Sequence, residues 1–413
     1  MTLPQQPAQP QQPQPRPQSQ SQLQFQPQSR PRQPENPSFQ QPQPETPPVQ
    51  QPRQPQPQQQ PSPQQPRQQF AMQQLQPPSL PADPYAEWLM RVRRAFSRIG
   101  GALCVMIVIW YALATVLSGV LYTALHTANM PNWASYVASG APLYLLAMPV
   151  AVLIMRKLPV VETRAFDMKP SLFLKLLVMC FPLMYVGSII GNFLAEALSD
   201  GKASDAVSDL AMQLDVWNVV FLVIIGPIFE EWIFRKEIIS RARRYGEKTA
   251  IVFSALAFGL FHMNLFQFFY AFALGLVFGY VYVRTSKLRY SIAMHMIINF
   301  NGGVLAPWVI TRVDTRQMES MAEQLEGGNS AMATAWLEQN LPSLAVAGVY
   351  FVVYLAVLIA GVVLLVRERR RFEFYTAPEE LPRGLRAKTA CGNVGVITFI
   401  VLAVLLTAIN LLA

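Results

Sequence analysis

The chain has little charge and few cysteines for its 413 residues. Only 14% of the residues are charged and 52% are hydrophobic, whereas about 25% of a typical soluble protein is charged. This composition excludes an ordinary soluble protein and predicts a polytopic membrane protein. The three cysteines, Cys104, Cys180 and Cys391, lie within or at the edge of apolar stretches and show no CxxC spacing. They therefore indicate neither a disulfide framework nor a zinc–thiolate site.

The first 84 residues lack glycine entirely and contain 24 of the 35 prolines. They also contain very little that could form a core, which predicts a disordered, Pro/Gln-rich tail over residues 1–84 and a transmembrane domain over residues 85–413. A solvated spacer is one interpretation of the tail. A polyproline ligand for aromatic-groove domains is the other.

Nine apolar runs have roughly the length of a membrane-spanning helix, about twenty residues. They cover residues 99–125, 135–155, 171–197, 216–234, 249–263, 266–283, 290–310, 342–366 and 391–412. We therefore expect an all-α, multi-pass bundle of about eight to nine transmembrane helices in the cell membrane. The fifth and sixth runs are short and barely separated, as in a tight helical hairpin, and the ninth run places the C-terminus outside if it spans.

Basic residues cluster before the first run and after the second, fourth, sixth and eighth, whereas the loops after the third and seventh runs are mainly acidic. The positive-inside rule then predicts that the basic loops and the N-terminal tail are cytoplasmic. This pattern also accounts for the net charge of +9 without a nucleic-acid partner, because the clusters do not form one continuous basic face.

Polar side chains with catalytic chemistry occur on three separate apolar runs. The fourth of the nine runs, 216–234, carries the adjacent Glu230 and Glu231. Carboxylates at membrane depth are costly and usually functional. Arg235 lies four residues after Glu231 on the same helical face, so an ion pair is expected there. Glu230 is then free to face the bundle interior as a general base. The competing interpretation is a structural salt bridge at a helix end.

The chain contains only three histidines, and two of them lie on the other polar sites. His262 lies four residues after Phe258, on the same helical face. A lone histidine at such a position can also be an ordinary packing residue without a catalytic role. His295 and Asn299 are four residues apart, so one helical face presents an imidazole and a carboxamide to a common point. Such a pair suits an oxyanion or a metal ion, although Asn also packs helices in membranes.

The three motifs occur in the order typical of a known family. Pro227-x-x-Glu230-Glu231-x-x-x-Arg235, Phe258-x-x-x-His262 and His295-x-x-x-Asn299 resemble the CAAX prenyl protease and bacteriocin-processing family, also called CPBP or Abi. The resemblance covers roughly residues 216–301. Lys236 departs from the pattern, since many bacterial members have Gly directly after the motif arginine.

The resemblance implies a glutamate-dependent intramembrane endopeptidase that cleaves a peptide or protein substrate near the cytoplasmic membrane face. Glu230 and His262 would position and deprotonate the attacking water, and His295 and Asn299 would hold the oxyanion. Glu231 and Arg235 would support them. Members have been classed as metalloproteases, yet the chain has no HExxH motif. We therefore expect no tightly bound metal, with a divalent metal left open.

Two other functions remain open from the sequence. The first alternative is a non-catalytic member of the same family, which would act as a membrane scaffold or a bacteriocin immunity protein. A proton-coupled transporter that relays protons through Glu230, His262 and His295 is the second alternative. It predicts inverted repeats, which the sequence does not show.

Overall fold

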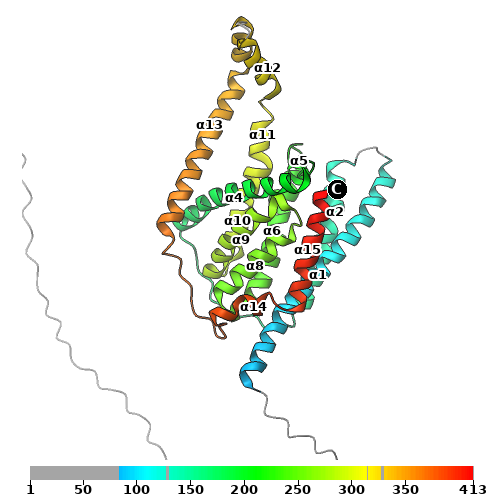
Figure 1. Cartoon of the computed structure of the whole chain (residues 1–413), viewed down its shortest axis with the longest axis vertical. Coiled ribbons are helices and arrows are strands. Elements are labelled where there is room, and N and C mark those ends of the chain that lie inside the picture. Colours follow the sequence, from blue (N-terminus) through cyan, green and yellow to red (C-terminus); the bar gives the residue numbers. More distant parts are fainter. Residues whose placement is uncertain (1–82, 127–129, 314, 327–329, 413) are drawn as a thin grey trace, which may run out of the picture. The chain divides into compact units, whose positions relative to one another are not determined.

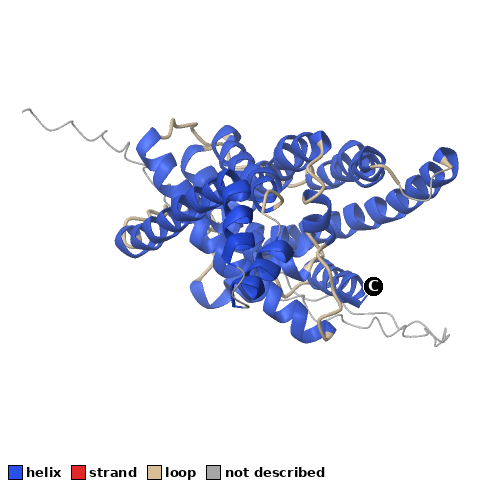
Figure 2. Cartoon of the chain, turned by 90° about the horizontal axis from the view of Figure 1, so that it is seen from above, coloured by secondary structure: helices blue, strands red, loops and turns tan. Residues whose placement is uncertain are grey.

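A computed structural model describes residues 83–126, 130–313, 315–326 and 330–412. The predicted tail, residues 1–84, lies outside these ranges except for its last two residues, so its disorder stays a prediction. In the described ranges every regular element is a helix, as Figure 2 shows. The prediction of an all-α membrane bundle is confirmed.

The helical elements follow one another in this order along the chain. They are α1 (Pro84–Leu125), α2 (Asn132–Pro142), η1 (Leu143–Ala147), α3 (Met148–Met155), α4 (Pro170–Ser199), α5 (Ala206–Ala211), η2 (Asn218–Ile225), α6 (Gly226–Glu231), η3 (Trp232–Ile239), α7 (Ser240–Ala242), η4 (Arg243–Tyr245), α8 (Glu247–Phe261), α9 (Leu265–Thr285), α10 (Leu288–Phe300), η5 (Asn301–Leu305), α11 (Ala306–Ile310), α12 (Thr315–Glu326), α13 (Ser330–Glu368), η6 (Arg383–Leu385), α14 (Arg386–Ala390) and α15 (Val394–Leu412). Four of these, η1, η2, η3 and η5, are π-helical.

Seven described helices are long and apolar enough to cross a membrane. They are Pro84–Leu125, Asn132–Met155, Pro170–Ser199, Leu265–Thr285, Leu288–Ile310, Ala331–Glu368 and Val394–Leu412. The two other predicted runs, 216–234 and 249–263, are helical as well. Neither is among the seven, because the first is divided into the short elements η2, α6 and η3 and the second, α8, has only 15 residues.

Two groups of helices pack around a central pair, which consists of the helical segment Asn218–Tyr245 and α8. On one side α1 packs against α15, α2 and α3, and Figure 1 shows α15 running alongside α1. On the other side α4 packs against α9 and α13. Glycines permit these close contacts: a Cβ on Gly187 of α4 would lie 2.6 Å from the backbone of Tyr270 in α9.

The two helical segments of the central pair are joined by a turn at Gly246. The first of these arms is helical from Asn218 to Tyr245 and therefore continues beyond the predicted end at residue 234. Gly246 has a φ of 125°, which only glycine adopts readily, and α8 follows directly. Glu230 and His262 are each 16 residues from Gly246. Phe234 on the first arm contacts Phe258 on the second, so α8 folds back along the arm that carries Glu230.

A tight turn joins α8 to α9, in agreement with the predicted hairpin. Met263 has a φ of 46°, and the Asn264 side chain caps α9 by accepting a hydrogen bond from the Phe266 backbone N–H at 2.9 Å. The Asn264 amide also donates to Asp205 Oδ1 at 2.8 Å. This contact ties the turn after His262 to the acidic loop before α5.

The loops predicted to share the cytoplasmic side contact one another. Arg243 in η4 and Arg284 in the last turn of α9 both pair with Glu247. Glu379 accepts hydrogen bonds from Trp88 at 3.0 Å and from Arg244 at 2.8 Å. Thus the first turns of α1, the η4 turn before α8 and the segment before α14 lie together. Their orientation towards the cytoplasm stays a prediction.

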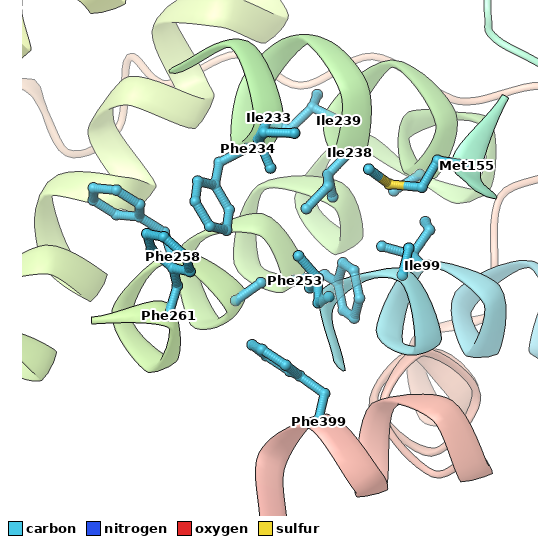
Figure 3. Packing of buried hydrophobic residues seen from close by; sticks show 14 of the residues in the cluster. Ile99, Met155, Ile233, Phe234, Ile238, Ile239, Phe253, Phe258, Phe261 and Phe399 are labelled. Atoms are coloured by element: carbon cyan, nitrogen blue, oxygen red, sulfur yellow. The ribbon is translucent and has the colours of Figure 1, made fainter. Parts of the chain in front are cut away.

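An apolar cluster holds the two arms of the central pair together. Figure 3 shows Phe234 on η3 pointing towards Phe258 and Phe261 on α8, and both ring pairs have centroids 5.2 Å apart. The same cluster reaches Ile99 on α1 and Phe399 on α15. Burial of these large side chains fixes the rotation of η3 against α8, and with it the directions of the polar groups beside them.

Candidate active site

Irregular helix surrounds the adjacent glutamates on both sides. α6, which contains them, lies between the π-helical segments η2 and η3. A π-helical turn shifts the backbone hydrogen bonds out of the α-helical register, and such turns are frequent at functional sites. Pro227, at the start of α6, has no N–H to donate to the preceding turn. The predicted break at Pro227 is therefore part of a longer irregular stretch.

Glu231 belongs to a buried polar chain. Arg235 Nε donates to Glu231 Oε2 at 3.0 Å, and neither side chain has exposed surface. Arg235 Nη1 donates to Ser254 Oγ at 3.0 Å, and that hydroxyl donates to the carbonyl of Phe234 at 2.6 Å. The guanidinium also lies 4.8 Å from the ring centroid of Phe258. The expected ion pair of Glu231 and Arg235 thus exists and anchors Glu231 to α8.

Glu230 has a different environment from its neighbour. Its side chain keeps 15% of its surface exposed, and its nearest charged group is His295, whose Nε2 lies 3.8 Å from Glu230 Oε2. No hydrogen bond to its carboxylate occurs among the described residues. Its charge is therefore not neutralised by an arginine or lysine, and its oxygens are free to accept protons.

His295 stands between the two glutamates. Its Nδ1 is 3.3 Å from Glu231 Oε1, while Nε2 faces Glu230. The ring centroid lies 5.8 Å from that of Phe258 and 5.3 Å from that of Phe278. Glu231, held by Arg235, therefore orients the imidazole, in the way that a carboxylate orients the histidine of a catalytic triad.

His262 lies at the end of α8 with one ring nitrogen engaged. Its Nδ1 is 2.8 Å from the Phe258 carbonyl, which can only accept, so Nδ1 carries the proton. In the neutral ring Nε2 is then left with its lone pair. The Phe258 ring contacts both histidines, with its centroid 4.9 Å from that of His262 and 5.8 Å from that of His295. Because His295 also faces Glu230, the structure brings these three predicted side chains into one neighbourhood, without a hydrogen bond between His262 and Glu230 among the described residues.

Asn299 is turned towards backbone instead. Its Nδ2 donates to the Leu222 carbonyl in η2 at 2.9 Å. The π-helical register of η2 is the physical reason, since a carbonyl displaced from its usual partner needs another donor. His295 contacts the glutamates, so the two side chains do not present their donors to one common point in this structure.

The residues of the site include groups that can bind a metal ion. In the described ranges, no group of three or more His, Cys, Asp or Glu side chains is arranged to hold one. Nδ1 of His295 contacts Glu231 and Nδ1 of His262 contacts a carbonyl, which leaves Nε2 of each ring. Metal-ligating histidines usually have their other nitrogen engaged in this way, so the expectation of no tightly bound metal stays a prediction.

Two residues that sequence reasoning missed belong to this neighbourhood. Ser254 completes the Arg235 chain, and Tyr144 on η1 lies beside Glu230. A serine or tyrosine inside an apolar run carries no distinguishing pattern, so neither residue had a sequence signal. Only the packing of η1 and α8 against the arm that carries the glutamates reveals them.

Comparison with known proteins agrees with the motifs. The family model "Type II CAAX prenyl endopeptidase Rce1-like" matches residues 212–301. The curated protein "Putative membrane peptidase YdiL" of Bacillus subtilis (strain 168) is 30% identical over 168 residues, which is 38% of this chain. The match covers 66% of that relative, just under two thirds of its length. No solved structure matches the chain. The matched segment contains all three polar motifs, so the similarity to the type II CAAX prenyl endopeptidase Rce1-like model supports the resemblance to the CPBP family.

Proposed function

We propose that this protein is an intramembrane endopeptidase in which Glu230 and His262 activate a water molecule for attack on a peptide bond. One observation carries the proposal: of two adjacent glutamates, Glu231 is fully buried and paired with Arg235, whereas Glu230 is unpaired by any arginine or lysine and partly exposed. A structural salt bridge explains Glu231 but not Glu230. Glu230 is an available base beside two imidazoles.

The reaction divides between the groups in a defined order. Glu230 removes a proton from water, with the free Nε2 of His262 accepting a second hydrogen bond from the same water. The water oxygen attacks the carbonyl carbon, and the carbonyl electron pair moves to oxygen. When the C–N bond breaks, its electron pair goes to the nitrogen, and Glu230 returns the proton to that leaving amine.

We assign the oxyanion to His295 together with Asn299, following the family motif. A protonated His295 donates through Nε2, and its second N–H faces the anchored carboxylate of Glu231. Asn299 contributes its amide only if it releases the Leu222 carbonyl. While Asn299 stays bonded to Leu222, His295 is the one motif residue left to donate a hydrogen bond to the oxyanion.

The depth of the site constrains how a substrate arrives. The 15 residues of α8 separate His262 from the arginine-rich turn at Gly246, a length of about 22 Å. The hydrocarbon core is about 30 Å thick. The proposed cleavage point therefore lies deeper than the cytoplasmic face expected from the motifs, and an apolar or lipid-anchored peptide segment is the substrate class that reaches it.

The function is tested with the full chain purified in detergent and reconstituted in liposomes. Prenylated and non-prenylated peptides are incubated with the wild type, Glu230→Ala and His262→Ala, and products are identified by mass spectrometry. His126→Ala and Glu196→Ala are matched controls, because both side chains are exposed and far from the site in sequence. Cleavage by the wild type and both controls, with loss in both site variants, supports the proposal. Unchanged cleavage by Glu230→Ala and His262→Ala rejects it.

A further inference from the structure

Three oxygen atoms surround one point beside Gly226. A Cβ added to Gly226 would lie 3.5 Å from Glu230 Oε1, 3.5 Å from the Tyr144 hydroxyl and 3.1 Å from the Phe221 carbonyl. The Tyr144 hydroxyl on η1 therefore lies near the proposed base on α6. It is the hydrogen-bond donor of the three, because a carbonyl and a carboxylate accept.

The Tyr144 hydroxyl is also uncommitted. It makes no hydrogen bond with any described residue, and it is not among the fully enclosed polar atoms that lack a partner. The hydroxyl therefore keeps some accessible surface, through which it can donate a hydrogen bond to another group.

The ring of Tyr144 is held in place by its surroundings. Its centroid lies 4.9 Å from that of Phe229, the residue before Glu230. Two turns earlier, the Tyr136 hydroxyl donates to Asn218 at 2.8 Å, and its ring stacks on that of Phe221 at 5.2 Å. These contacts fasten α2 and η1 to η2. η1 is itself π-helical, like the segments on either side of α6.

We propose that the Tyr144 hydroxyl is a catalytic oxyanion donor, which hydrogen-bonds the carbonyl oxygen of the scissile peptide beside Glu230. This assignment rests on the proposed function and supplies a second donor, since Asn299 is bonded to Leu222. Tyr144 keeps its proton throughout. As the water attacks, negative charge develops on the carbonyl oxygen and the hydrogen bond from Tyr144 strengthens, and it weakens again when the C–N bond breaks.

The decisive variant is Tyr144→Phe, which keeps the ring and its contact with Phe229. Loss of an oxyanion donor typically costs about 100- to 1,000-fold in kcat. We expect a fall of this size, with KM changed less than about 3-fold, because the lost interaction forms only in the transition state. Tyr122→Phe is the matched control, since Tyr122 is exposed on α1. It should cleave at the wild-type rate.

A second variant crowds the hydroxyl and leaves it in place. Gly226→Ala puts a methyl group 3.5 Å from both Glu230 Oε1 and the Tyr144 hydroxyl. It should hinder the approach of a carbonyl oxygen and lower kcat while thermal unfolding stays near that of the wild type. If Tyr144→Phe unfolds at a lower temperature, the Gly226→Ala result decides the matter.

The outcomes separate this inference from the function on which it rests. Inactive Glu230→Ala with Tyr144→Phe at the wild-type kcat overturns only the role of Tyr144. Glu230→Ala at the wild-type rate overturns the base assignment and the oxyanion donor together. A change in KM alone for Tyr144→Phe also overturns the proposal, because it shows uniform binding rather than transition-state stabilisation.

Discussion

Arg235 Nε donates a 3.0 Å hydrogen bond to Glu231 Oε2, and the two side chains are completely shielded from solvent. This ion pair makes two neighbouring carboxylates unequal. Glu231 is a structural anchor whose other oxygen contacts His295, and Glu230 has no arginine or lysine partner among the described residues. The pair joins α6 to α8 through Ser254, so its integrity affects both stability and the alignment of the imidazole.

Because Glu231 is paired with Arg235 and Glu230 is not, we expect opposite effects from the same substitution at the two positions. Glu231→Gln leaves the buried charge of Arg235 unpaired and should destabilise the fold by about 3 to 5 kcal/mol. Glu230→Gln removes no ion pair with arginine or lysine and should change stability by less than about 1 kcal/mol, while it abolishes cleavage. Thermal unfolding in detergent measures the first effect and peptide cleavage the second. A greater loss of stability in Glu230→Gln would contradict the assignment.

Ser254→Ala removes the hydroxyl between Arg235 and the Phe234 carbonyl. Because a buried donor and a buried acceptor then lose their partner, we expect a loss of about 1 to 3 kcal/mol in unfolding free energy. Ser320→Ala on α12 is the control, since that serine is exposed. Equal unfolding midpoints for the two variants would show that the polar chain does not stabilise the central pair.

The contact of α4 with α9 predicts a difference between two glycines in helices. A Cβ at Gly187 would lie 2.6 Å from the Tyr270 backbone, whereas a Cβ at Gly119 on α1 would meet nothing within 4 Å. Gly187→Ala must therefore push the helices apart and lower the unfolding temperature. Gly119→Ala should leave it unchanged or raise it slightly, because alanine favours helix by about 1 kcal/mol. Similar midpoints would contradict the close packing.

Asp167, in the loop between α3 and α4, predicts a pH effect at the surface. Hydrogen bonds from Lys287 and Tyr290, together with the charge of Arg289, lower the pKa of its carboxyl from 3.8 to about 2. A lowered pKa means that this carboxylate stabilises the fold above pH 3.8 and loses that effect as the pH falls through about 2. The unfolding temperatures of the wild type and Asp167→Asn should therefore differ above pH 4 and converge towards pH 2. A constant difference across this range would contradict the contact.

Metal removal gives a further prediction. Because the described donors do not form a three-ligand group, incubation with EDTA or 1,10-phenanthroline should leave peptide cleavage unchanged. The measurement is the cleavage rate in liposomes before and after dialysis. Loss of cleavage that returns with added zinc would assign the imidazoles to a metal ion and reject the metal-free base.

Local sequence patterns predicted the features that depend on a single helix. Apolar runs predicted the spanning helices because a bilayer demands about twenty apolar residues from any chain that crosses it. The four-residue spacing predicted the pair of Glu231 and Arg235 because neighbours at that distance share a helical face. The three motifs also predicted the family, and the match over residues 212–301 agrees.

Tertiary packing alone decided how those helices rotate and how deep each side chain lies. The turn at Gly246 folded α8 back along the arm that carries Glu230, and the π-helical register of η2 drew the Asn299 amide to a carbonyl. The place of Tyr144 beside Glu230 depends on aromatic contacts between helices far apart in the chain. The periodicity of one helix states which residues share a face, whereas the direction of that face is determined by the volume and hydrogen bonds of its neighbours.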